Sequence, residues 1–267
     1  MPEGDTIWRT ARTLQAALAG KTVVDLHSPL PAVAVAARRL EVVGRTVESV
    51  QARGKHLLIR FRGGAVLHTH QGMKGRWHLR RPGAAPPRRV ARPRVVVTVD
   101  DAVATCHGAP VVEILSSRQA ATHPALSRLG PDLLDPDFDP RAARARLRAR
   151  GDAEVGVALM DQTALAGVGN VYKSEILFVA GVSPFVRVRD LDDEALDRVL
   201  ATARALLQRN LGPGERRTTT AATAGPLWVY GRRGRACRRC GAAVRRVSQG
   251  EQARSTYFCP GCQARRD

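Results

Sequence analysis

Residues 165–177 have the sequence LAGVGNVYKSEIL, in which two glycines separate two apolar segments with helical spacing. This pattern predicts a helix that ends at the glycines, a tight turn, and a second helix that begins around Val171 with Asn170 as its cap. Gly167 and Gly169 allow the backbone to approach a phosphate, and exposed N–H groups at the new helix start favour an anion. A plain helical hairpin with an asparagine cap explains the same residues, so other parts of the chain must distinguish the two interpretations.

Four cysteines lie C-terminal to this stretch, in two pairs with the spacing C-x2-C-x18-C-x2-C. Two such turns present four thiolates to one tetrahedral zinc ion, and a site with four protein ligands is structural. Zinc is favoured over the alternatives, an iron–sulfur cluster or a redox dithiol. The predicted ligands are Cys237, Cys240, Cys259 and Cys262.

A hairpin is expected between the two cysteine pairs, and its second strand is QARSTYF. Strand alternation places Arg254, Thr256 and Phe258 on one face of this strand. An arginine on a zinc hairpin of a very basic protein is a candidate DNA contact. A solvated surface arginine is the alternative.

Residues 21–116 contain many short apolar segments separated by Gly, Pro or charged residues, and no helix is expected between them. This pattern predicts an antiparallel sandwich or barrel. Lys55 enters the strand RGKHLLIRF at 53–61, where it is either a solvated edge residue or a side chain that projects into a site. Cys106 is predicted to be a packed strand residue, and the Pro/Arg-rich segment 80–94 a surface loop.

The first residues, MPEGDT, precede a segment whose apolar residues repeat with the period of a helix. The apolar positions are Ile7, Ala11, Leu14 and Leu18. Asp5 or Thr6 is expected to cap this helix, and Gly20 to end it. The chain terminus is therefore held at the start of a helix that is anchored in a core.

Removal of Met1 makes Pro2 the N-terminal residue, with a free secondary amine. An α-amino group has a pKa of about 8, so a useful fraction is neutral and nucleophilic near neutral pH. The positive end of the helix dipole favours the neutral amine and an ionised Glu3. On these residues alone, an idle terminal proline is the stronger interpretation.

The chain has 267 residues, of which 44% are hydrophobic, and 43 Lys and Arg against 24 Asp and Glu give a net charge of +19. So basic a globular chain is expected to bind a polyanion. Nucleic acid is favoured over a membrane, because the sequence has no apolar run of about 18 residues and no long basic amphipathic helix. The acidic, polar N-terminus does not resemble a signal peptide, so a cytoplasmic protein is expected.

The composition changes after a Pro/Asp-rich segment at 130–140, which is predicted to be a linker. An N-terminal domain is expected over 1–129, a helical domain over 141–226 and a cysteine-containing domain over 227–267. The segment 213–226 has no apolar period and is expected to be mobile. The predicted fold class is α+β.

Together these motifs resemble the formamidopyrimidine-DNA glycosylase/endonuclease VIII family. The resemblance rests on MPEG, RGKHLL, HPALSRLGPDLL, LAGVGNVYKSEIL, LWVYGR and RSTYFCPGCQ, in that order along the whole chain. It implies a bifunctional base-excision repair enzyme, a DNA glycosylase with abasic-site lyase activity. It also implies a β-sandwich N-terminal domain, a helix–two-turn–helix domain, a zinc finger, and a monomer that binds damaged DNA at the bacterial nucleoid.

The resemblance assigns roles to individual residues. Pro2 matches the family's nucleophile, Glu3 its proton donor, and Lys55 the lysine of β-elimination. Two further positions match residues that hold DNA phosphates, Arg128 and Asn170. Arg254 matches the zinc-finger arginine that is linked to phosphate binding and δ-elimination, and Met73 matches the side chain that is inserted into the duplex.

The sequence departs from the family at Thr6, where many members have a glutamate, which puts a second proton-relaying carboxylate in doubt. The Arg-Phe pair that the purine-acting branch uses is missing from ATCHGAPVVEIL, and the start MPEG has the endonuclease VIII form. Oxidised pyrimidines are therefore the favoured substrates. The alternatives are a purine-lesion glycosylase of the same family and a non-enzymatic zinc-ribbon protein that binds DNA.

Overall fold

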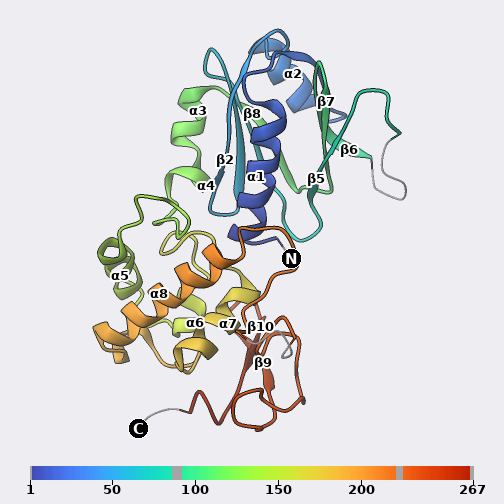
Figure 1. The fold of residues 1–267 in the computed structure, drawn as a ribbon. Coiled ribbons are helices and arrows are strands. Elements are labelled where there is room, and N and C mark those ends of the chain that lie inside the picture. Colours follow the sequence, from blue (N-terminus) through green and yellow to red (C-terminus); the bar gives the residue numbers. More distant parts are fainter. Residues whose placement is uncertain (1, 86–91, 221–224, 265–267) are drawn as a thin grey trace. The chain divides into compact units, whose positions relative to one another are not determined.

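The computed structural model describes residues 2–85, 92–220 and 225–264, and the chain divides into two compact units, 1–128 and 129–267 (Figure 1). Unit 1 is a β-sandwich with attached helices, and unit 2 is helical with a two-stranded hairpin. The predicted α+β class is confirmed. Among the described helices, none has both the length and the apolar character needed to cross a bilayer.

Unit 1 contains two antiparallel sheets of four strands each. The first sheet, in spatial order, consists of β1 (Val23–His27), β6 (Pro93–Val99), β7 (Ala102–His107) and β5 (Arg76–Arg80). The second consists of β2 (Val47–Arg53), β3 (His56–Phe61), β4 (Val66–His70) and β8 (Val111–Leu115). Their inward side chains form one apolar core. Cys106 lies in this core, as predicted, and burial raises the pKa of its thiol to about 12.

Helix α1 (Gly4–Leu18) packs against β2, and the four apolar residues that repeat with the helical period are all buried. The expected cap is wrong, however. Glu3 is the N-cap residue, its backbone oxygen accepts hydrogen bonds from the N–H groups of Thr6 and Ile7, and its side chain makes no capping bond. The helix therefore begins earlier than expected, directly after Glu3.

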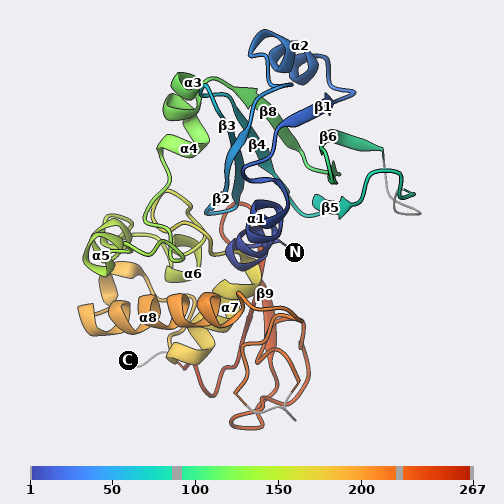
Figure 2. The same ribbon diagram turned by 45° about the horizontal axis from the view of Figure 1, so that its top comes forward.

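Three further helices belong to unit 1, and the sequence pattern did not predict them: α2 (Pro31–Arg39), α3 (Ser117–Thr122) and α4 (Pro124–Ser127). The alternating letters of PAVAVAARR imitate a strand. Pro31 nevertheless starts a helix, because proline suits the first helical turn, and Val33 and Ala37 then share one buried face. Figure 2 shows α3 and α4 beside the sheet of β2, β3, β4 and β8.

Unit 2 is built on the packing of α7 (Asn170–Ala180) against α8 (Asp193–Arg209). The other elements are α5 (Pro140–Arg148), α6 (Val155–Ala158), the 3-10 helix η1 (Val188–Asp190), β9 (Arg245–Gln249) and β10 (Arg254–Phe258). The helix expected before the glycines is only the four-residue α6, followed by turns. Leu133, from the segment 130–140, is fully buried in the core of this unit.

The segment 213–226, which is expected to be mobile, contains two buried residues. Thr218 and Thr219 are 1% and 0% exposed, and the Thr219 hydroxyl donates to the Gly225 carbonyl at 2.6 Å. Residues 221–224 of this segment, and residues 86–91 of the predicted Pro/Arg-rich loop, lie outside the described part of the chain.

Candidate functional site

The N-terminal residues of unit 1 place a partly exposed proline next to a buried acid. Pro2 is half-buried, and Glu3, the residue that starts α1, is 0% exposed. A carboxylate at this position is stabilised by the positive end of the helix dipole. A potential nucleophile and a potential proton donor are thus adjacent on a rigid element.

Asp5 is a second fully buried carboxylate at this terminus, and the sequence did not single it out as a functional residue. The Thr6 hydroxyl donates a hydrogen bond to Asp5 Oδ1 at 3.2 Å. Thr6, the position that departs from the family, is therefore tied to a neighbouring acid. The sequence signal that could have identified Asp5 is its position as an acidic residue in the first turn of a helix.

Lys55 lies in the two-residue turn of the β2–β3 hairpin, in which Arg53 and His56 are directly paired. Gly54, the first turn residue, has φ of +58°, as the first central position of a type II′ turn requires. Burial lowers the pKa of His70, and the Lys55 ammonium lowers it further. Lys55 therefore lies close to the end of β4.

Two more predicted DNA contacts of unit 1 lie at exposed positions. Met73 is 67% exposed in the turn after β4, a turn closed by a hydrogen bond from the Gly75 N–H to the Gln71 carbonyl at 2.7 Å. Arg128 is exposed and caps the C-terminal end of α4. Both side chains are accessible to a ligand.

Asn170 is the first residue of α7, not its cap, because Gly169 occupies the N-cap position. The cap prediction for Asn170 is therefore wrong. Its side chain is 5% exposed, and Oδ1 has no hydrogen-bond partner among the described residues. Buried polar atoms are normally hydrogen-bonded, so this amide is a candidate binding group.

Glu175, also on α7, is a buried carboxylate that the sequence did not single out. It accepts hydrogen bonds from the backbone N–H groups of Trp228, Val229 and Tyr230 at 2.8–2.9 Å and from the Thr218 hydroxyl. The helix of the predicted anion site is thereby attached to the segment 218–230.

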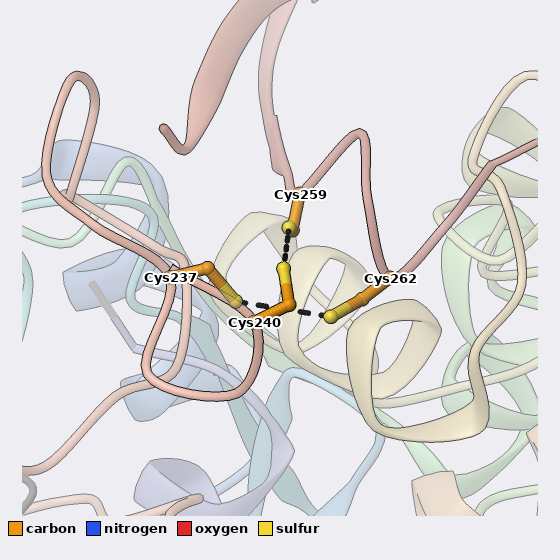
Figure 3. A group of neighbouring side chains, drawn as sticks. All are labelled: Cys237, Cys240, Cys259 and Cys262. Carbon is orange, nitrogen blue, oxygen red and sulfur yellow. Dashed lines mark hydrogen bonds between the residues drawn. The ribbon is translucent and has the colours of Figure 1, made fainter. Parts of the chain in front are cut away.

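The four predicted metal ligands come together in unit 2 (Figure 3). The Cys240 and Cys259 sulfurs are 3.4 Å apart, and those of Cys237 and Cys262 are 3.8 Å apart. Zn–S bonds of about 2.3 Å in a tetrahedron separate the sulfurs by about 3.8 Å, so the donor set fits one zinc ion. Burial raises the pKa of Cys237, but hydrogen bonds from the N–H groups of Arg239 and Cys240 outweigh it and lower the pKa to about 7.

Arg254 begins β10, is exposed, and donates from Nε and Nη2 to Gln252 Oε1 at 3.2 and 3.1 Å. It lines a cavity of about 640 Å³ together with the 1% exposed Lys173 of α7. Unit 2 therefore brings two cations to one concave surface.

Comparisons with known proteins match both units to one family. The formamidopyrimidine-DNA glycosylase N-terminal domain matches residues 1–108, and the formamidopyrimidine-DNA glycosylase H2TH domain matches residues 129–222. The probable endonuclease 8 2 of Streptomyces coelicolor is 43% identical over 99% of this chain and 94% of its own length. The DNA-(apurinic or apyrimidinic site) lyase Nei2 of Mycolicibacterium smegmatis is 41% identical, over 98% and 99%.

More distant relatives cover the chain equally well. Endonuclease 8 of Escherichia coli is 35% identical over 98% of this chain and 100% of its own length. The structure of Lactococcus lactis formamidopyrimidine-DNA glycosylase bound non-covalently to DNA with an abasic site has a TM-score of 0.84 at 25% identity, and covers 99% of this chain and 100% of that one.

Proposed function

Because this chain belongs to the formamidopyrimidine-DNA glycosylase family, we propose that it removes damaged bases from DNA and then cleaves the abasic site, as a bifunctional enzyme of base-excision repair. The observation that carries the proposal is the half-buried Pro2 beside the fully buried Glu3 at the start of α1. This pair provides a secondary amine and an acid on one rigid element.

Catalysis begins when the Pro2 nitrogen, exposed by removal of Met1, attacks C1′ of the damaged nucleotide. The C1′–N bond to the base breaks and the base leaves with the bonding electrons, while Glu3 protonates the ring oxygen as the sugar opens. The secondary amine forms a cationic iminium at C1′, a covalent intermediate of the Schiff-base type.

The iminium acidifies the protons on C2′. We assign the removal of one of these protons to Lys55. β-Elimination follows, in which the C3′–O bond breaks and the 3′ phosphate leaves. In a second elimination, assisted by Arg254, C4′ loses a proton to solvent, the C5′–O bond breaks and the 5′ phosphate leaves. Water then hydrolyses the iminium and releases Pro2. None of these reaction steps is an oxidation or a reduction.

The target nucleotide must leave the base stack before Pro2 can reach it, which costs a few kcal/mol, on the order of the energy of one unstacked base step. We assign the phosphate contacts to Arg128, Asn170 and Arg254, and the filling of the gap to Met73. The four cysteines hold one structural zinc ion, which supplies rigidity to the hairpin that carries Arg254.

Oxidised pyrimidines are the proposed lesion class. Support comes from the MPEG start, from the missing Arg-Phe pair, and from the endonuclease 8 names of several relatives. Excision of 8-oxoguanine or formamidopyrimidine lesions is the second candidate. We further propose a monomer that acts on the bacterial chromosome in the cytoplasm.

Borohydride trapping tests the chemistry. Duplex DNA with an oxidised pyrimidine is incubated with the enzyme and borohydride, which reduces the iminium to a stable protein–DNA adduct. We expect an adduct with the wild type and none when an N-terminal extension precedes Pro2→Gly. Absence of the wild-type adduct contradicts the proposed nucleophile and leaves a non-enzymatic DNA-binding protein as the explanation.

A lesion panel in the same assay tests the substrate class. Adduct formation with thymine glycol or dihydrouracil is expected to exceed that with 8-oxoguanine. Faster excision of 8-oxoguanine contradicts the assignment to pyrimidines.

A further inference from the structure

The outer face of the β2–β3–β4–β8 sheet carries four ionisable side chains in close polar contact, three of which are hydrogen-bonded in series. His56 Nδ1 is 2.9 Å from His68 Nε2, and His68 Nδ1 is 3.0 Å from Glu113 Oε2. The same oxygen is 3.1 Å from His123 Nε2. We call these four residues the histidine–glutamate chain.

Strand register brings the members together. His68 on β4 is directly paired with Glu113 on β8, and His56 on β3 is paired with His70 on β4. Side chains of directly paired residues point to the same face of a sheet. His56 and His68 are 8% and 1% exposed, so these two rings are buried, whereas the Glu113 side chain is 40% exposed.

The direction of each hydrogen bond follows from the two ends of the chain. The Glu113 carboxylate only accepts, so His68 donates from Nδ1 and its Nε2 must accept from His56 Nδ1. At the other end, His123 Nδ1 accepts from the Ala125 N–H at 3.2 Å, so its proton is on Nε2. His56 and His68 then each carry a proton on Nδ1, and both hydrogen bonds of the series have one donor and one acceptor.

The pKa values agree with this protonation state. Burial, followed by the surrounding histidines and Lys55, lowers the pKa of His56 to about 3. Burial also lowers the pKa of His68, although its bond to Glu113 acts in the opposite direction. The charged and titratable groups that face His56 are therefore Lys55, His68, His70 and His123. Those that face His68 are Glu113 and His123.

A metal ion is a poor alternative occupant of the group His68, Glu113 and His123. To bind a metal through Nε2, His123 would need its proton on Nδ1, but Nδ1 already accepts a hydrogen bond. A metal-bound histidine normally donates from its second nitrogen. The tautomer of this ring therefore argues against a metal ion at this position.

His56 connects the chain to Lys55. The two residues are consecutive, and Lys55 belongs to a hairpin turn of only two residues, with Arg53 paired to His56 across it. Fixing the ring of His56 therefore restricts the last residue before β3. At the opposite end, His123 ties β8 to the start of α4.

We propose that the histidine–glutamate chain is a positioning device for Lys55, in which Glu113 acts through His68 to hold His56 as its Nδ1–H tautomer and so to fix the β2–β3 turn. This role rests on the proposed function of Lys55 in β-elimination. His56, His68 and Glu113 are positioning residues and do not touch the substrate.

Nuclear magnetic resonance of the imidazole nitrogens tests the structure of the chain directly. We expect His56 and His68 as Nδ1–H tautomers and His123 as the Nε2–H tautomer at neutral pH. Glu113→Ala is expected to release His68 from this tautomer. An Nε2–H tautomer of His56 in the wild type overturns the proposal, whatever the enzyme's activity.

Single-turnover cleavage of a preformed abasic site tests the function. Glu113→Ala and His68→Leu are expected to slow strand cleavage by about tenfold to a hundredfold, as small displacements of catalytic groups do. Substrate affinity and the initial borohydride-trapped adduct, which depend on other residues, are expected to stay near wild type. Glu113→Gln keeps an accepting oxygen and is expected to restore cleavage to within about threefold.

Two controls separate this role from a general loss of structure. His107→Leu removes another buried histidine of unit 1, hydrogen-bonded to Thr105 on the other sheet, and is expected to leave the cleavage rate unchanged. In a double-mutant cycle, Glu113→Ala is expected to add no further loss in a Lys55→Ala background.

The outcomes are distinguishable. If the wild type cleaves the abasic site and the folded Glu113→Ala and His68→Leu enzymes cleave it at the same rate, the positioning role is overturned and the proposed function stays intact. Additive losses in the double-mutant cycle lead to the same conclusion. Absence of cleavage and of trapping in the wild type overturns the proposed function and, with it, the role of the chain. Should Glu113→Ala fail to fold, the tautomers of the wild type and the rate of Glu113→Gln decide the question.

Discussion

The two units of this protein divide the reactive residue types almost completely. All seven histidines lie in residues 1–128, whereas four of the five cysteines lie in residues 129–267. Each unit also buries a carboxylate in a helix terminus or helix, Glu3 in unit 1 and Glu175 in unit 2. The residue types that can exchange protons near neutral pH are therefore concentrated in unit 1, and the thiols that can bind a metal are concentrated in unit 2.

The carboxylates make the contrast specific. Four donors converge on the oxygens of Glu175, so this side chain holds the segment 218–230 in place by hydrogen bonds. Glu3 makes no side-chain cap to α1 and directly follows Pro2, the proposed nucleophile. A buried acid whose bonds hold backbone together is structural, and one beside a nucleophile is suited to proton transfer.

The largest effect is expected from Glu3→Gln. Losing a positioned proton donor should slow base release by about a thousandfold, because general acid catalysis contributes that order of rate. Single-turnover excision kinetics measure it. Glu41→Gln, an exposed carboxylate of the same unit, should leave the rate unchanged. A Glu3→Gln enzyme that excises at the wild-type rate would remove the contrast between the two buried acids.

A smaller effect, on stability, is expected from Glu175→Gln. The amide places N–H groups opposite backbone donors, so the free energy of unfolding should fall by about 3 kcal/mol. Urea denaturation measures the loss. Glu194→Gln, on the exposed face of α8, should change it by less than about 0.5 kcal/mol. Equal effects of the two substitutions would count against Glu175 as a structural carboxylate.

Removal of the metal should affect unit 2 and spare unit 1. Cys240→Ser is expected to lose the bound zinc and to weaken DNA binding by about thirtyfold, in the range seen when metal sites are perturbed. Metal analysis and fluorescence titration measure both. Cys106→Ala, in the core of unit 1, should keep the full metal content. Loss of the sandwich's β-sheet signal in Cys240→Ser would contradict the division into two units.

Low pH is expected to reduce the free energy of unfolding through a group in unit 1. The pKa of His56 is about 3 in the folded chain and 6.5 without the protein environment, so the unfolded chain binds the additional proton between these values. Stability from this group is complete above pH 6.5 and is lost as pH falls towards 3, by about 1.4 kcal/mol per pH unit. Urea denaturation at several pH values should show a shallower acid limb for His56→Asn, and an unchanged limb would argue against a neutral His56.

Local patterns predicted the elements in which a single periodicity dominates. The apolar repeat of 7–18 predicted α1, and the two CxxC pairs predicted the sulfur cluster. Both signals are confined to short segments, so no knowledge of distant neighbours was needed. The strand pattern likewise predicted an antiparallel sandwich or barrel, and the structure is a sandwich.

Other features depended on partners that are distant in sequence. Thr218 and Thr219 lie in a polar segment but are buried, because Glu175 and the chain at 225–228 supply their hydrogen bonds. The helix α2 was missed because PAVAVAARR alternates like a strand. Asn170 was expected as a cap, but Gly169 took that position.

The sequence by itself determined the α+β class, the leading helix, the cysteine cluster and the family, because these depend on residue type and on spacing along the chain. Only the tertiary structure decided that His56, His68 and Glu113 are hydrogen-bonded in series, with His123 next to Glu113. Their separations of 12 and 45 residues carry no periodic signal. Strand register selects which side chains become neighbours, and register is set by the packing of the whole sheet.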